Sequence, residues 1–135
     1  MKKALVPLLA LLLVVPQVAA AQSSIACLYM LLRVYHKETE HCGVALSKDY
    51  ENRYLRFRAN MEKYIRANAK GDAEAMIAGI AKNEDKDLAG LKSCQSDDFK
   101  LAQQALDNLL APSNEHVVVE NLKIVRDPQA GSCGS

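Results

Sequence analysis

The 135-residue chain contains no tryptophan, and its other aromatic residues are five tyrosines and two phenylalanines. A core built from this sequence has to be mostly aliphatic, so cross-links would help to stabilise it. The longest apolar run, residues 4–15, is too short to cross a bilayer, which takes about 20 apolar residues. The chain also lacks a C-x-x-C pair, a G-x-S-x-G elbow, a Walker loop, a G-x-G-x-x-G motif and a calcium loop. The usual signatures of thiol chemistry, hydrolysis and nucleotide binding are therefore missing.

Residues 1–21 have the layout of a secretory signal peptide, with Lys2 and Lys3, the apolar run and then small residues. We predict cleavage after Ala21, which would place residues 22–135 in the periplasm or outside the cell. The alternative is a lipoprotein, because "SIAC" loosely resembles a lipobox ending at Cys27. Ser24 stands where such a box has a large aliphatic residue, and lipidation would leave three cysteines, whereas four can all pair.

Net charge indicates no particular partner. Loss of Lys2 and Lys3 leaves 15 basic residues (17 minus 2) against 16 acidic ones, a formal net charge of −1. This balance provides no attraction to nucleic acid and no general attraction to an anionic membrane. The 114 residues that remain (135 minus 21) correspond to one domain, without an integral membrane span.

Helical periodicity predicts a helical domain over residues 22–112, with helices over 24–41, 47–70, from 73 and from 97. The polar run around Asn83 leaves open whether the third helix is continuous. The expected caps and stops are Gly43, Ser47, Gly71, Asp72, Ser96 and Pro112. On the second helix, an aromatic face is expected inward, comprising Tyr50, Tyr54, Phe57, Met61, Tyr64 and Ile65.

Residues 113–135 differ in character, since "EHVVVENLKIV" is rich in β-branched residues. Val118, Leu122 and Val125 also match a helical stripe, but we favour an extended segment. The expected fold is therefore mainly all-α, a four- to five-helix up-and-down bundle with an extended, β-like C-terminal segment and two disulfides.

Four cysteines allow three disulfide pairings, and helix geometry favours one of them. Cys27 and Cys42 would lie about 22 Å apart on one helix, whereas a disulfide needs Cα atoms within about 7 Å. Alternating helix directions bring Cys94 to the end of the bundle that holds Cys42. We therefore predict a Cys42–Cys94 disulfide, and a second one in which Cys133 pins the C-terminal segment to Cys27.

The segment "HKETEHCG" concentrates titratable side chains between residues 36 and 43. His36 and His41 are five positions apart, hence about 140° apart on a helix, whereas a helical zinc motif has its histidines four apart. We interpret this segment as the polar end of the first helix, closed by a disulfide and a glycine. A weak divalent-metal site completed by His116 is the alternative, and no cofactor or metal is expected.

Two charged sets remain as candidate surfaces. The basic stripe, opposite the aromatic face of the second helix, consists of Arg56, Lys63, Arg66 and Lys70. It is either an ordinary solvated face or a binding surface for an acidic partner. The acidic residues Glu84, Asp85 and Asp87 are expected on a solvated face rather than in a catalytic carboxylate pair.

These patterns predict a non-catalytic protein-binding module in the cell envelope, inhibitor-like or immunity-like, that uses the basic stripe or residues 116–125. The alternative is an envelope-stress or acid-stress holdase, which would bind weakly when acid exposes apolar surface. In format the chain resembles small exported helical proteins such as periplasmic immunity proteins and acid-stress chaperones. The resemblance covers the signal, size, helices and cysteines alone, so it assigns no site residue.

Overall fold

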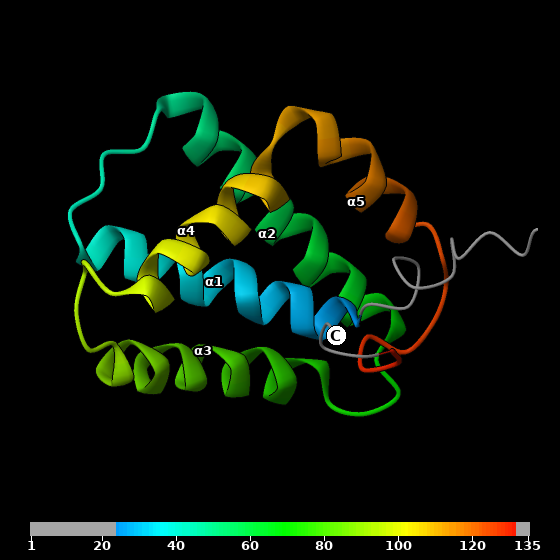
Figure 1. The fold of residues 1–135 in the computed structure, drawn as a ribbon. Helices are drawn as coiled ribbons and strands as arrows, with labels where there is room; N and C mark the ends of the chain where they lie inside the picture. Colours follow the sequence, from blue (N-terminus) through cyan, green and yellow to red (C-terminus); the bar gives the residue numbers. More distant parts are fainter. Residues whose placement is uncertain (1–23, 132–135) are drawn as a thin grey trace, which may run out of the picture.

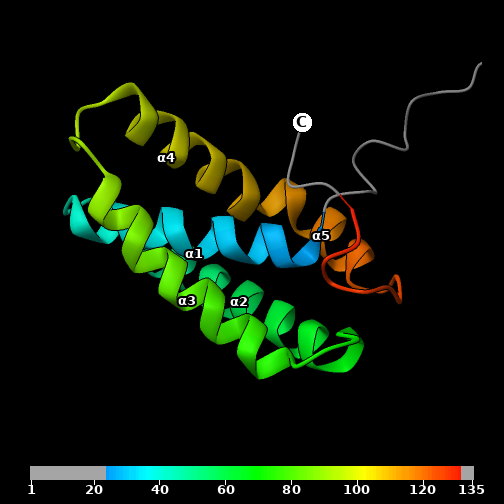
Figure 2. The same ribbon diagram turned by 90° about the horizontal axis from the view of Figure 1, so that it is seen from below.

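The computed structural model describes residues 24–131, which form a bundle of α-helices without strands (Figure 1). Helix α1 lies in the middle, and successive long helices run in alternating directions around it (Figure 2). The elements are α1 (Ile25–His41), α2 (Lys48–Asn68), α3 (Ala73–Gly90), α4 (Asp97–Leu110), the 3-10 helix η2 (Pro112–Asn114) and α5 (Glu115–Asn121). The predicted helical bundle is confirmed. The predicted signal peptide, residues 1–21, lies outside the described residues.

Side-chain caps start the four long helices where the sequence predicts them. The N-terminal caps are Ser24, Ser47, Asp72 and Ser96. Each accepts a hydrogen bond from a backbone N–H three residues later, 3.0–3.2 Å away. Such a cap contributes about 1 kcal/mol, because it satisfies a donor that the helix itself leaves free. Helix α1 ends before Gly43, whose φ of 66° suits a glycine, and α3 continues unbroken through Asn83.

The prediction of an extended C-terminal segment is wrong for the residues described. Glu115–Asn121 form α5, which buries Val118 at 6% exposure and packs Leu122 against the core. The helical stripe prevails over β propensity because a helix satisfies its own backbone hydrogen bonds, whereas a lone strand has no partner ladder. Val125, the third member of that stripe, lies beyond the helix and is exposed.

The core forms where α1 meets the apolar faces of α2, α3 and α4. The aromatic face of α2 is buried as predicted, with Tyr54, Phe57, Met61, Tyr64 and Ile65 all at 5% exposure or less. Tyr50 is half-buried at the edge of this face. From the other elements, Ile25, Tyr29, Leu32, Ile80, Leu106, Leu110 and Val118 complete the core cluster.

The chain after α5 returns to the start of α1 as part of the folded unit. Pro128 is fully buried, and its carbonyl accepts from Ser24 Oγ at 2.7 Å and from the backbone N–H of Ala26 at 2.9 Å. The Tyr64 hydroxyl contacts the same segment at the backbone carbonyls of Ile124 and Arg126. Hydrogen bonds therefore already hold this part of the tail against α1 and α2.

A disulfide between Cys42 and Cys94 is confirmed, with Cα atoms 5.5 Å apart. It joins the end of α1 to the loop between α3 and α4. Cys27 is also disulfide-bonded, and Cys133, its predicted partner, lies outside the described residues, so that pairing stays a prediction. A disulfide and lipidation at Cys27 exclude each other, because both use Sγ.

Candidate functional site

The end of α1 that carries "HKETEHCG" is closed by the disulfide and by Gly43, as predicted. His36 is 5% exposed and stacks flat on Tyr54, with ring centroids 3.5 Å apart. Its Nε2 lies 3.0 Å from Glu51 Oε1, and its Nδ1 lies 3.8 Å from Glu40 Oε2. His36 is therefore part of the packing between α1 and α2, and this part of the segment is not a free polar end.

His36, Glu40 and Glu51 also form the one group in residues 24–131 whose ligand atoms, within 4.8 Å of one another, could share a metal ion. His41 and His116 do not belong to it. The two carboxylates approach different ring nitrogens, Glu51 at Nε2 and Glu40 at Nδ1. The absence of a metal stays a prediction. Glu51 was missed because its approach depends on α2 folding back beside α1.

The basic stripe is partly neutralised within the chain. Arg56 Nη2 pairs with Glu115 Oε1 of α5 at 2.9 Å, and Arg66 Nε pairs with Glu74 Oε1 of α3 at 2.6 Å. Lys63 and Lys70 have no ion pair among the described residues. The stripe therefore fastens α2 to its neighbours through two residues and leaves two ammonium groups for solvent or a partner.

A buried polar network fills the side of α1 that faces α2 and α3. The Tyr29 hydroxyl donates to Glu62 Oε1 at 2.7 Å and accepts from Arg33 Nη1 at 2.8 Å. Arg33 Nε pairs with Glu84 Oε2 at 2.7 Å, and both side chains are about one-tenth exposed. Glu84 is therefore a structural partner of α1 rather than the solvated charge expected from its polar run.

The opposite side of α1 is only partly covered by its neighbours: Val34 is buried there at 6% exposure, but Leu31 and Tyr35 beside it are not. Leu31 lies two positions from Tyr29 and so about 200° around the helix. Leu31 and Tyr35 are half-buried and line two hollows, of about 550 and 390 Å³, that meet along α1. Together these hollows form one groove, with α3 and α4 along one part and α4 and α5 along the other.

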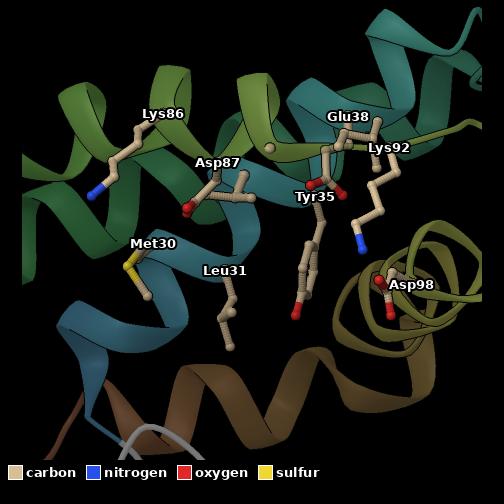
Figure 3. Close-up of a pocket in the computed structure, with 11 residues that line it drawn as sticks. Met30, Leu31, Tyr35, Glu38, Lys86, Asp87, Lys92 and Asp98 are labelled. Carbon is tan, nitrogen blue, oxygen red and sulfur yellow. The ribbon is translucent and has the colours of Figure 1, made fainter.

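The two ends of this groove differ in chemistry. The apolar end is lined mainly by Leu28, Leu31, Tyr35, Ala105, Leu109, Val117 and Val118, with Asn108, Asn114 and Asn121 beside them. The acidic end, drawn in Figure 3, carries Glu38 of α1, Asp87 of α3 and Asp98 of α4 beside Met30, Leu31 and Tyr35. The groove thus combines an aliphatic floor with an end that carries three carboxylates and the two lysines Lys86 and Lys92.

Burial and like charges perturb the titrating groups at the acidic end. Burial raises the pKa of Glu38, and the nearby carboxylates of Asp87 and Asp98 raise it further. The pKa of Tyr35 is likewise raised, first by burial and then by Glu38 and Asp87. Both shifts have the same physical cause, namely an apolar site in which negative charges repel one another.

The sequence contains only a weak signal for this groove. The pattern of α1 is apolar on most sides, which predicts a central helix but not which face its neighbours leave open. Asp87 is exposed, as expected, but the spacing along the chain did not indicate that it lies at the rim of a groove with Glu38. Residues 116–125 do supply exposed apolar side chains, and Val117 belongs to the apolar end.

Fold and groove define a small, disulfide-linked, all-α protein with a groove along its central helix. Comparison of the chain with family models, with curated proteins and with solved structures finds no match. Among the helices described, none combines the length and apolarity needed to cross a membrane.

Proposed function

We propose that this protein is an exported, non-catalytic binding module that docks a helical segment of a partner protein in the groove on α1. The observation that carries the proposal is the apolar strip from Leu28 to Tyr35, along which Leu28, Leu31 and Tyr35 stay half-buried and line the hollows between α3, α4 and α5. Grooves of this kind bind the apolar face of an amphipathic helix.

The dimensions of the groove suit such a segment. Leu28 and Glu38 are ten residues apart, which is about 15 Å along α1 and corresponds to about three turns of a docked helix. Val117 is 42% exposed at the apolar end, and asparagines stand beside it. An apolar floor with a polar rim is the usual composition of a specific protein interface.

The Cys42–Cys94 disulfide supports export, since structural disulfides persist in oxidising compartments and are rare in the cytosol. It also joins α1 to the loop that continues from the acidic end, where Leu91 and Lys92 line the groove. A preformed groove loses less conformational freedom on binding than a mobile one.

The test is capture of partners from a native periplasmic extract on the oxidised protein and on two matched variants. Val117→Glu places a charge at the edge of the groove, whereas Leu55→Glu places the same charge on α2, at a side chain that is 52% exposed. We expect a partner at fixed stoichiometry with the wild type and the Leu55 variant, and its loss with the Val117 variant. Equal capture by both variants would refute docking in the groove.

The basic stripe is a separate candidate surface, for an acidic patch on the partner. Lys63→Glu tests it most directly, because reversing Arg56 would also break the ion pair with Glu115. If the stripe contributes, the Lys63 variant lowers the association rate and weakens the salt dependence of binding. Unchanged association at low salt would leave the stripe an ordinary solvated face.

An acid-stress holdase is the second candidate, favoured by an acid-sensitive contact between α1 and α2, in which Glu62 accepts from Tyr29. Burial alone would raise the pKa of Glu62, but hydrogen bonds from Tyr29 and Arg58 lower it on balance. Its protonation in acid removes a link between α1 and α2. Suppression of aggregation of an unfolded client at pH 3 but not at pH 7, with no selective partner at pH 7, would favour this candidate.

A further inference from the structure

Glu38 is the most buried of the charged residues that line the groove. It is 9% exposed, yet its carboxylate makes neither a hydrogen bond nor an ion pair with another described residue. In Figure 3 it projects from α1 into the opening beside Tyr35. Its oxygens still reach solvent through the opening, so the free-energy cost of holding the charge there is partial, and a cationic partner would offset it.

The charges that act on Glu38 within the chain do not compensate it. Asp87 and Asp98 approach from α3 and α4, and both are acidic. Lys86 and Lys92 also line the opening, but neither forms an ion pair with a carboxylate among residues 24–131. The acidic end therefore presents three carboxylates and two lysines, a formal net charge of −1 (two minus three), to whatever occupies it, and neither lysine is paired with Glu38.

A bare metal ion does not suit this arrangement. In the described part of the chain, only the group around His36 brings three ligand atoms close enough to share an ion. Glu38, Asp87 and Asp98 are more widely spaced and surround an apolar floor that includes Met30 and Leu31. Arginine and lysine match both features, because an aliphatic stem carries their charge.

We propose that the segment docked in the groove inserts an arginine or lysine side chain at the acidic end, where it pairs with Glu38. This inference rests on the proposed function and specifies the chemistry of the partner. The stem of the cationic residue lies against Leu31 and Tyr35, while aliphatic side chains further along the segment fill the apolar end. The required partner sequence is an amphipathic helix with a basic residue at one end of its apolar face.

The test uses two helix-forming probe peptides of 18 residues, built from alanine, glutamine and a stripe of leucines. One carries arginine at the end of the stripe, and the other carries norleucine at that position. Titration of each into the oxidised protein, followed by heteronuclear NMR, gives its affinity and the residues that it contacts. We expect the arginine peptide to bind at least tenfold more tightly than the norleucine peptide.

Variants separate the two proposals. Glu38→Gln keeps the shape of the side chain and should reduce the ratio of affinities to near one, and Asp98→Asn, at an exposed position, should reduce it partly. Val117→Glu should weaken the binding of both peptides, and Leu55→Glu should change the binding of neither.

Equal affinity of both peptides for the wild type overturns the arginine pairing and leaves groove docking intact. If neither peptide binds, or if the Val117 variant binds both normally, groove docking itself is overturned.

Discussion

Removal of the Cys42–Cys94 disulfide is expected to lower the free energy of unfolding by about 4 kcal/mol. The cross-link spans 52 residues, and closing a loop of that length in the unfolded chain removes conformational entropy of about this magnitude. Cys94 is exposed and Cys42 only half-buried, so little packing is lost with the sulfur atoms. The effect should therefore come mainly from the unfolded state.

The assay is urea unfolding of the oxidised wild type and of the Cys42→Ser/Cys94→Ser double variant, followed by far-ultraviolet circular dichroism. With a slope of about 2 kcal/mol per molar urea, the loss corresponds to a midpoint lower by about 2 M. The slope itself should rise, because the unfolded chain becomes less compact without the cross-link. Chemical reduction of the wild type is a poorer experiment, since it would also reduce the disulfide at Cys27.

A loss below about 1 kcal/mol with an unchanged slope would refute the entropic reasoning. The same variant also tests the link between the disulfide and the groove, because Leu91 and Lys92 precede Cys94 and line the acidic end. If the disulfide holds this loop in place, the double variant binds the arginine peptide more weakly under conditions in which it is still folded. Unchanged affinity would show that the groove forms without it.

Leu106→Ala should lower the free energy of unfolding by about 2–5 kcal/mol, because Leu106 is fully buried. Leu101→Ala, on the exposed side of the same helix, should lower it by about 0.5 kcal/mol or less. Similar losses for the two variants in urea unfolding would contradict the packing of α4. The pKa of Glu62 is lowered in the folded state, so its contribution is present above the unfolded pKa of about 4.3 and is lost as the pH falls further. Unfolding of Glu62→Gln should therefore depend less on pH between 5 and 2 than unfolding of the wild type, and equal dependence would contradict this role. Calorimetric titration with Zn²⁺ should show no saturable binding, and stoichiometric binding abolished by His36→Ala would instead identify a metal centre.

Much of the fold could be predicted because its signals are local. A serine or aspartate before an apolar periodic segment starts a helix by accepting from the backbone, whatever lies elsewhere in the chain. The aromatic face of α2 was predictable for a similar reason, since side chains at helical spacing have to be buried together. The pairing of Cys42 with Cys94 followed from helix lengths and alternating directions alone.

The C-terminal segment shows where local signals compete. Its β-branched residues favour an extended chain, while Val118 and Leu122 share a helical face. Burial decided between them, because the helix places both side chains against the core and needs no partner strand. Nothing in residues 115–125 alone indicates that this contact is available.

The sequence by itself determined the four long helices, their caps, the inward face of α2 and one disulfide, because each depends on residues close in the chain or on simple helix geometry. Only the tertiary structure decided what the outer side chains meet. It placed Glu51 beside His36, paired Arg56 and Arg66 with acidic neighbours, and formed a groove along α1 with Glu38 at one end. These relations depend on how helices cross in space, and the spacing of residues along one helix does not determine that.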